Sequence, residues 1–213
     1  MHKYLTEFIG TFFLSLTAIL ATTGNYSAMA PLAVGAILIG LTGIGWEISG
    51  AHYNPVVSLA LLIRGKMERT DFLYYILAQV FGAILAGTIA VFLTESSLSS
   101  IPEIDPRQNA LLPAIIAEFL GTFAWSMVVI HAVLNKSNAT RSSIMLGMVV
   151  LALGIAFRDM SGAIFNPAVA VAYMIAGMAF WNDLLLYLIG PMLGAGAAAS
   201  AFYLMDKARE EEI

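Results

Sequence analysis

The sequence predicts an all-α membrane protein, with six transmembrane helices and two re-entrant half-helices in an inverted three-plus-three repeat. Three observations support this fold class. The 213 residues are 60% hydrophobic and 11% charged, whereas soluble domains are about 45–50% apolar and about 25% charged. Apolar stretches of about 20 residues, the length that crosses a bilayer, recur along the chain. Similar segments also occur in both of its halves.

Six stretches are expected to span the membrane. They are residues 4–23, 30–48, 71–93, 111–133, 142–158 and 183–205. The first begins almost at Met1 and no A-x-A-like cleavage site follows it, so we interpret it as a retained helix rather than a signal peptide. We expect one transmembrane channel domain over residues 1–213, with repeat 1 at 1–95 and repeat 2 at 111–213.

Basic residues predict the orientation of the chain. They cluster before the first span and then after every second span: Lys3; Arg64, Lys66 and Arg69; Lys136 and Arg141; Lys207 and Arg209. Because cytoplasmic segments carry the excess of Lys and Arg, both termini are expected in the cytoplasm, and segment 95–113 outside. The compact termini and loops favour the inner membrane of a prokaryotic cell.

Two pairs of segments define the repeat. LTEFIGTF (5–12) recurs as IAEFLGTF (116–123), and SGAHYNPV (49–56) recurs as SGAIFNPA (161–168). Glu7 therefore matches Glu118, and Asn54 matches Asn166. Each repeat contains three spans, an odd number, so the second copy enters from the opposite side and the repeat is inverted.

Each Asn-Pro precedes an apolar run, at 56–63 and 168–177. These runs are too short to cross a core of about 30 Å at about 1.5 Å per residue, so we expect half-helices. Asn54 and Asn166 suit the N-cap, and Pro55 and Pro167 suit the first helical position. Half-helices that enter from opposite faces would meet near the midplane.

The doubled SGAxxNP motif, the paired EFxGTF segments and the three-plus-three layout resemble the aquaporin, or major intrinsic protein, family over essentially the whole chain. The resemblance implies an aquaporin-like fold and a homotetramer with one pore per subunit. It also implies a passive channel in the lipid bilayer that passes water and small uncharged solutes and excludes protons and ions. The residues that match the pore motif are Asn54, Pro55, Val56, Asn166, Pro167 and Ala168.

The resemblance also assigns roles to individual residues. The amides of Asn54 and Asn166 would donate hydrogen bonds to a passing molecule; the alternative is that they are only helix caps. Glu7 and Glu118 would accept hydrogen bonds from the re-entrant loops, with a proton relay as the alternative. His52 is expected at the inner pore mouth, either as a group that responds to pH or as a fixed neutral histidine.

The expected selectivity filter departs from the family pattern. Typical members have arginine directly after the second Asn-Pro-Ala, where this chain has Val169. Spacing from the asparagines places the other filter positions at Val34, Gly154 and Ala163. These four residues include no cation and no bulky aromatic side chain. We therefore expect a wider filter that passes glycerol, urea, ammonia or hydrogen peroxide besides water.

Arg158 lies near the outer end of the fifth span. Two interpretations stay open at this point. The side chain either reaches into the outer vestibule, in place of the missing arginine, or it pairs with Asp159 or extends to the membrane interface.

Other functions have less support. The chain has no cysteine, three scattered histidines and no catalytic or phosphate-binding motif, so we expect no enzyme, metal or cofactor. A net charge of −4 offers no basic surface for nucleic acid. A secondary transporter of a small neutral solute is the main alternative, because inverted repeats and broken helices occur there too. An ion channel is disfavoured by two positive helix ends without a ring of carboxylates.

Overall fold

The computed structural model describes residues 1–23, 27–94 and 111–211. In this part of the chain, six helices are long and apolar enough to cross a membrane. They are α1 (His2–Thr23), α2 (Ala30–Ser49), α4 (Arg69–Thr94), α5 (Leu111–Leu134), α6 (Ala139–Ser161) and α8 (Leu184–Glu211). The predicted fold class and its six spans are confirmed. Most of the expected outer loop, 95–110, lies outside the described residues.

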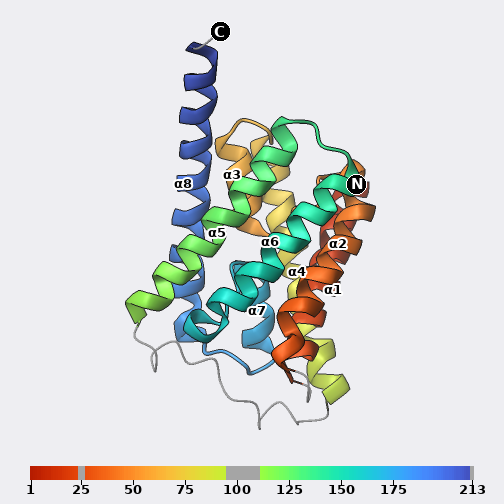
Figure 1. Cartoon of the computed structure of the whole chain (residues 1–213). Helices are drawn as coiled ribbons and strands as arrows, with labels where there is room; N and C mark the ends of the chain where they lie inside the picture. The colour runs from red at the N-terminus through yellow and green to blue at the C-terminus, as the bar shows by residue number, and fades with distance from the viewer. Residues whose placement is uncertain (24–26, 95–110, 212–213) are drawn as a thin grey trace.

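Two helices of half length complete the bundle. They are α3 (Pro55–Ile63) and α7 (Pro167–Ile175), of nine residues each. The second ends two residues earlier than predicted, because the chain turns at Gly177, whose φ is +75°. Short 3₁₀ turns, η1 (Ser27–Met29) and η3 (Trp181–Asp183), precede α2 and α8. In Figure 1, α3 and α7 occupy opposite halves of the bundle.

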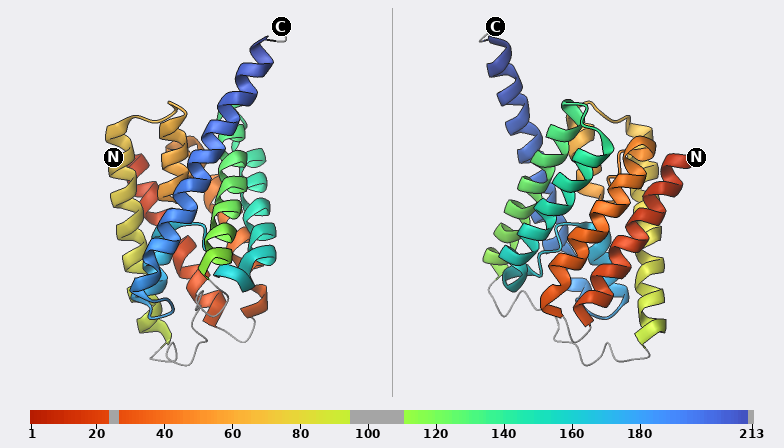
Figure 2. Two further views of the ribbon diagram at one scale, coloured as in Figure 1. Left: turned by 90° about the vertical axis from the view of Figure 1, so that its left-hand side faces the viewer. Right: turned by 45° about the vertical axis from the view of Figure 1, so that its right-hand side comes forward.

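Helix packing follows the repeat. In the first half α1 packs against α4, and in the second half α5 packs against α8. Each half-helix also packs against the last helix of the other repeat, α3 against α8 and α7 against α4, while α2 and α6 pack against each other. The two halves are therefore interlocked, and each re-entrant segment is enclosed by helices from both (Figure 2).

The start of α1 and the end of α8 lie toward the same end of the bundle, and α8 projects beyond the other helices there (Figure 1). The loops after α3 and α5, which carry basic clusters, lie at this end too. Lys3 Nζ is 2.7 Å from Asp71 Oδ2, which ties α1 to α4. Arg64 pairs with Asp206 and so ties the end of α3 to the projecting part of α8.

The crossing of α2 and α6 depends on glycine. A Cβ added at Gly35 would lie 2.7 Å from Leu151 Cβ and 2.8 Å from the carbonyl oxygen of Gly147. At Gly40, on the same helix, an added Cβ would have nothing within 4 Å. The backbones of α2 and α6 can approach this closely only because two contact positions, Gly35 and Gly147, have no side chain.

Gly35→Ala is therefore expected to destabilise the protein by about 1–3 kcal/mol, because the added methyl group forces the two helices apart. Gly40→Ala is the matched control and should be neutral or slightly stabilising, since alanine is the better helix former. Thermal unfolding in detergent measures both variants. Equal melting temperatures for the two would contradict the packing described here.

Candidate functional site

The N-termini of the two half-helices are capped by asparagine. Asn54 Oδ1 accepts a hydrogen bond from the backbone N–H of Val56 at 3.0 Å. Asn166 Oδ1 accepts from the backbone N–H groups of Ala168 at 3.0 Å and Val169 at 3.4 Å. Pro55 and Pro167 occupy the first helical position, where no N–H is needed.

The two asparagines also join the repeats to each other. Asn54 Nδ2 donates to the carbonyl oxygen of Phe165 at 2.9 Å, and Asn166 Nδ2 donates to that of Tyr53 at 2.8 Å. An amide nitrogen carries two hydrogens. Among the described residues each amide nitrogen has one protein acceptor, so one N–H of each asparagine has no acceptor in this part of the chain.

Glu7 holds the first re-entrant loop. Its carboxyl group is fully buried and accepts four hydrogen bonds. Oε1 accepts from Ser49 Oγ at 2.7 Å and from the His52 N–H at 3.0 Å. Oε2 accepts from the Tyr53 N–H at 2.7 Å and from Gln79 Nε2 at 2.8 Å. Two backbone N–H groups that no helix or sheet could satisfy are therefore paired inside the bundle.

Glu118 holds the second loop in the same way. It too is fully buried. Its carboxyl group accepts from Ser161 Oγ at 2.6 Å and from the N–H groups of Ile164 at 3.0 Å and Phe165 at 2.6 Å. The equivalence of these contacts to those of Glu7 shows that both copies of the motif adopt one local structure.

That local structure uses left-handed backbone at residues other than glycine. Such conformations cost about 1–2 kcal/mol per residue. Left-handed residues follow Gly50 and Gly162, whose φ angles are near +82° and +85°, at matching positions in both loops. The four residues are Ala51, Tyr53, Ala163 and Phe165, with φ between 47° and 52°. The carboxyl groups of Glu7 and Glu118 bind N–H groups of the last two residues before each asparagine and so stabilise this backbone.

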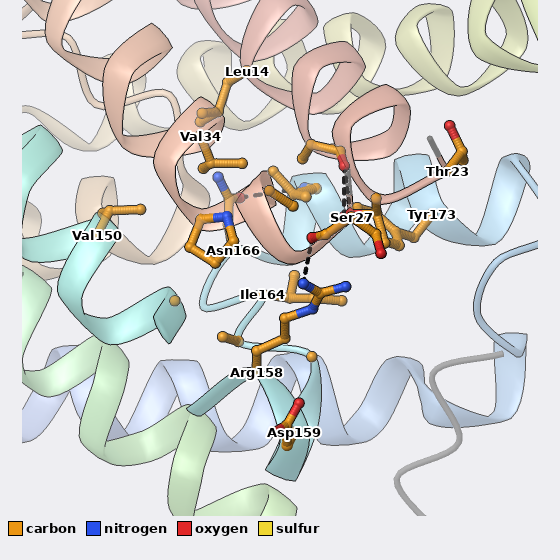
Figure 3. Close-up of a pocket in the computed structure, with 18 of the residues that line it drawn as sticks. Leu14, Thr23, Ser27, Val34, Val150, Arg158, Asp159, Ile164, Asn166 and Tyr173 are labelled. Atoms are coloured by element: carbon orange, nitrogen blue, oxygen red, sulfur yellow. Dashed lines mark hydrogen bonds between the residues drawn. The ribbon is translucent and has the colours of Figure 1, made fainter. Parts of the chain in front are cut away.

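A cavity of about 410 Å³ leads to the second asparagine. The four residues predicted to form the filter, Val34, Gly154, Ala163 and Val169, all line it, and so does Asn166. Asn54 is fully buried and lies outside this lining. Figure 3 shows Leu14, Val34 and Val150 on one side of the cavity, and Thr23, Ser27 and Tyr173 on another. The cavity therefore has an apolar wall and a polar wall.

Arg158 lines this same cavity from the last turn of α6. Its guanidinium group donates a hydrogen bond to the backbone carbonyl of Ser27, in the turn before α2 (Figure 3). Asp159 also contributes to the lining. The side chains of Arg158 and Asp159 therefore lie at one cavity, and a role of the arginine in place of the missing filter arginine stays a prediction.

His52 lies toward the other side of the bundle. It is 7% exposed, and its Nδ1 is 2.9 Å from Ser58 Oγ. Its ring lies 5.0 Å from that of Tyr75. It lines a cavity of about 500 Å³ together with Lys66 and Glu68. The histidine therefore contacts both the re-entrant helix and a cavity near the basic loop.

Sequence reasoning missed several supporting residues. The hydroxyl groups of Tyr75 and Tyr187 donate to the carbonyl oxygens of Ser49 and Ser161, at 2.7 and 2.9 Å. Their equivalence was detectable, because they are separated by the same interval of 112 as the two asparagines.

Trp46 also received no role from the sequence. Its Nε1 donates to the carbonyl of Ser137 at 2.9 Å, in the loop before α6. This bond is the counterpart of the one between Arg158 and Ser27, because Trp46 and Arg158 occupy matching positions in the two repeats. One residue thus connects the end of a long helix to the opposite repeat at each mouth.

The chain is similar in sequence to proteins of one known family. The family model described as "Major intrinsic protein" matches residues 1–203. The chain is 33% identical to "Glycerol uptake facilitator protein-like 6" of Lactiplantibacillus plantarum, covering 93% of this chain and 95% of that protein. It is 28% identical to "Aquaporin AqpM" of Methanothermobacter thermautotrophicus, covering 94% and 95%.

A solved structure shows the same fold. The aquaglyceroporin from Plasmodium falciparum superposes with a TM-score of 0.78 at 23% identity, covering 93% of each chain. The likeness in fold therefore extends over nearly the whole chain.

Glu7→Gln is expected to destabilise the protein by about 2–3 kcal/mol, because the new NH₂ group faces donors where an acceptor is needed. Glu118→Gln should act similarly, and both should lower water permeability because the half-helix tips shift. Glu47→Gln, at an exposed position, is the control and should behave like wild type. Thermal unfolding and stopped-flow water flux measure these effects; a fully stable Glu7→Gln variant would contradict the role given to the carboxyl group.

Proposed function

The chain belongs to the major intrinsic protein family, and on this premise we propose that it is a passive channel through which water and small uncharged solutes cross a membrane. It is an integral, multi-pass membrane protein and not an enzyme. The observation that carries the proposal is the cavity that ends at Asn166, beside the meeting point of two helix N-termini.

The half-helix tips supply the means of selection at the midplane. Each helix N-terminus carries roughly half an elementary positive charge, which disfavours cations and protons there. We propose that the remaining amide N–H of Asn54 and of Asn166 donates to the oxygen of each passing molecule. Capping and donation are compatible, because they use different atoms of the same amide.

The volume of the outer cavity leaves room for solutes larger than water. It is about 410 Å³, whereas one water occupies about 30 Å³ in the liquid. Val34, Gly154, Ala163 and Val169 leave that volume open and offer no charged side chain. We propose that glycerol, urea, ammonia or hydrogen peroxide pass besides water, and a similarity to proteins named for glycerol supports this.

A channel accounts for the buried carboxyl groups better than a coupled transporter of a small neutral solute does. Proton or ion coupling needs ionisable groups that change partners during transport. Glu7 and Glu118 instead accept hydrogen bonds from backbone and side-chain donors that fix the loops. The lining beside the tips is neutral, with Asn166, Ala163 and Val169, and its two charged residues, Arg158 and Asp159, come from the last turn of α6.

We further propose a homotetramer with one pore in each subunit, located in a prokaryotic inner membrane with both termini in the cytoplasm. Large apolar side chains are exposed along the outer helices, as in Phe13, Ile44 and Phe81, and these suit lipid or neighbouring subunits. The basic loops at the end of the bundle that holds the chain termini support the orientation.

Proteoliposomes that contain the protein should pass water, glycerol and urea faster than empty vesicles in stopped-flow light scattering. Val169→Arg should lower glycerol and urea permeability about tenfold, because a long cationic side chain fills the cavity, while water still crosses. Val169→Ile is the control and should have a small effect. Saturation, counterflow or dependence on a proton gradient would favour a transporter instead.

Orientation can be mapped with single cysteines, because the natural chain has none. Ala28 and Lys136 are exposed and lie in the turn before α2 and the loop before α6. In intact spheroplasts an impermeant maleimide should label Ala28→Cys, while Lys136→Cys should react only after permeabilisation. The reverse pattern would place the termini outside.

A further inference from the structure

We propose that Arg158 is a specificity-determining residue of the outer cavity, where its guanidinium group donates hydrogen bonds to oxygen atoms of entering solutes. The inference rests on the channel function proposed above and assigns a selective role to a residue outside the four filter positions. It is carried by the location of Arg158, its hydrogen bonding and its counterpart in the first repeat.

The backbone of Arg158 is fixed at the start of the second re-entrant loop. Its carbonyl oxygen accepts the N–H of Gly162, the left-handed residue that ends α6, at 2.8 Å. The side chain then reaches η1, where Nη1 bonds the Ser27 carbonyl. The guanidinium group is therefore held between two elements of the cavity wall (Figure 3).

Three hydroxyl groups of the cavity lining are already engaged. Thr22 Oγ1 donates to the carbonyl of Ala18 at 2.7 Å, and Tyr173 OH donates to the same carbonyl at 3.0 Å. Thr23 Oγ1 donates to the carbonyl of Leu20 at 2.9 Å. These hydrogens are used within the protein, so the charged fork of Arg158 is the strongest donor at this level of the cavity.

Comparison with Trp46, the matching residue of the first repeat, shows that Arg158 has more N–H donors than the connection between helices requires. Trp46 makes the equivalent bond to Ser137 with an indole, which has a single N–H. Arg158 makes its bond to Ser27 with one of five N–H donors. A connection alone needs one donor, as Trp46 demonstrates. The guanidinium group of Arg158 has further N–H groups, and this residue lines the cavity.

The apolar side chains of the cavity lining make the donor groups of Arg158 important for polar solutes. Val34, Val150 and Val169 offer no hydrogen bond to a molecule that has shed water at the mouth. A solute with hydroxyl or carbonyl oxygens recovers part of its lost hydration by accepting from Arg158. Water, which is smaller, depends less on this one contact because it can keep water neighbours in a cavity of this volume.

The test measures glycerol, urea and water permeability of wild type, Arg158→Met and Arg158→Lys in proteoliposomes. Arg158→Met should lower the ratio of glycerol or urea to water permeability about fivefold, because a charge-assisted hydrogen bond at a partly exposed site is lost. Arg158→Lys keeps a cationic donor and should recover part of the ratio. Arg141→Met, exposed near the start of the same helix, should leave the ratio unchanged.

Other outcomes overturn the proposal in distinguishable ways. If water and solutes fall together in Arg158→Met, together with a lower melting temperature, the residue only connects α6 to η1. If glycerol permeability rises, the side chain obstructs the path rather than assisting solutes. A wild type that passes water but none of the solutes contradicts the wide path proposed above and this role with it, whereas an unchanged ratio in a conducting protein contradicts the role of Arg158 alone.

Discussion

Two buried carboxyl groups make the central structure possible. The re-entrant loops place non-helical backbone inside the bundle, where an unpaired N–H costs several kcal/mol, and they include left-handed residues that are unfavourable by themselves. Glu7 and Glu118 each accept two consecutive backbone N–H groups and a serine hydroxyl. Without these acceptors the half-helices would not start at the midplane, and the asparagines would not face each other.

The two repeats keep this arrangement but differ around it. The side-chain amide of Gln79 gives Glu7 a fourth donor, whereas the matching position near Glu118 is Pro191, whose side chain has no donor. At the mouths, Trp46 is matched by Arg158. The meeting point of the half-helices is thus nearly symmetric, while the residues at its two approaches are chemically different.

Much of the fold followed from the sequence, because its signals are local. Spans follow from the length of apolar runs, and half-helices follow from Asn-Pro before runs too short to cross. The filter positions followed from resemblance and spacing, and Val34, Gly154, Ala163 and Val169 do meet at one cavity. Residues such as Thr22, Tyr173 and Gln79 were not predictable, because their roles depend on which helices pack together. The direction of the Arg158 side chain also depended on the tertiary position of Ser27.

The reciprocal bonds between Asn54 and Phe165 and between Asn166 and Tyr53 have a consequence for biosynthesis. The acceptor of Asn54 is encoded 111 residues downstream, so at about 5–20 residues per second the ribosome needs roughly 5–20 seconds to supply it. During that interval the first half of the nascent chain holds a re-entrant segment with an unsatisfied tip. The final docking of this tip therefore waits for the second half of the chain, which supplies the carbonyl of Phe165.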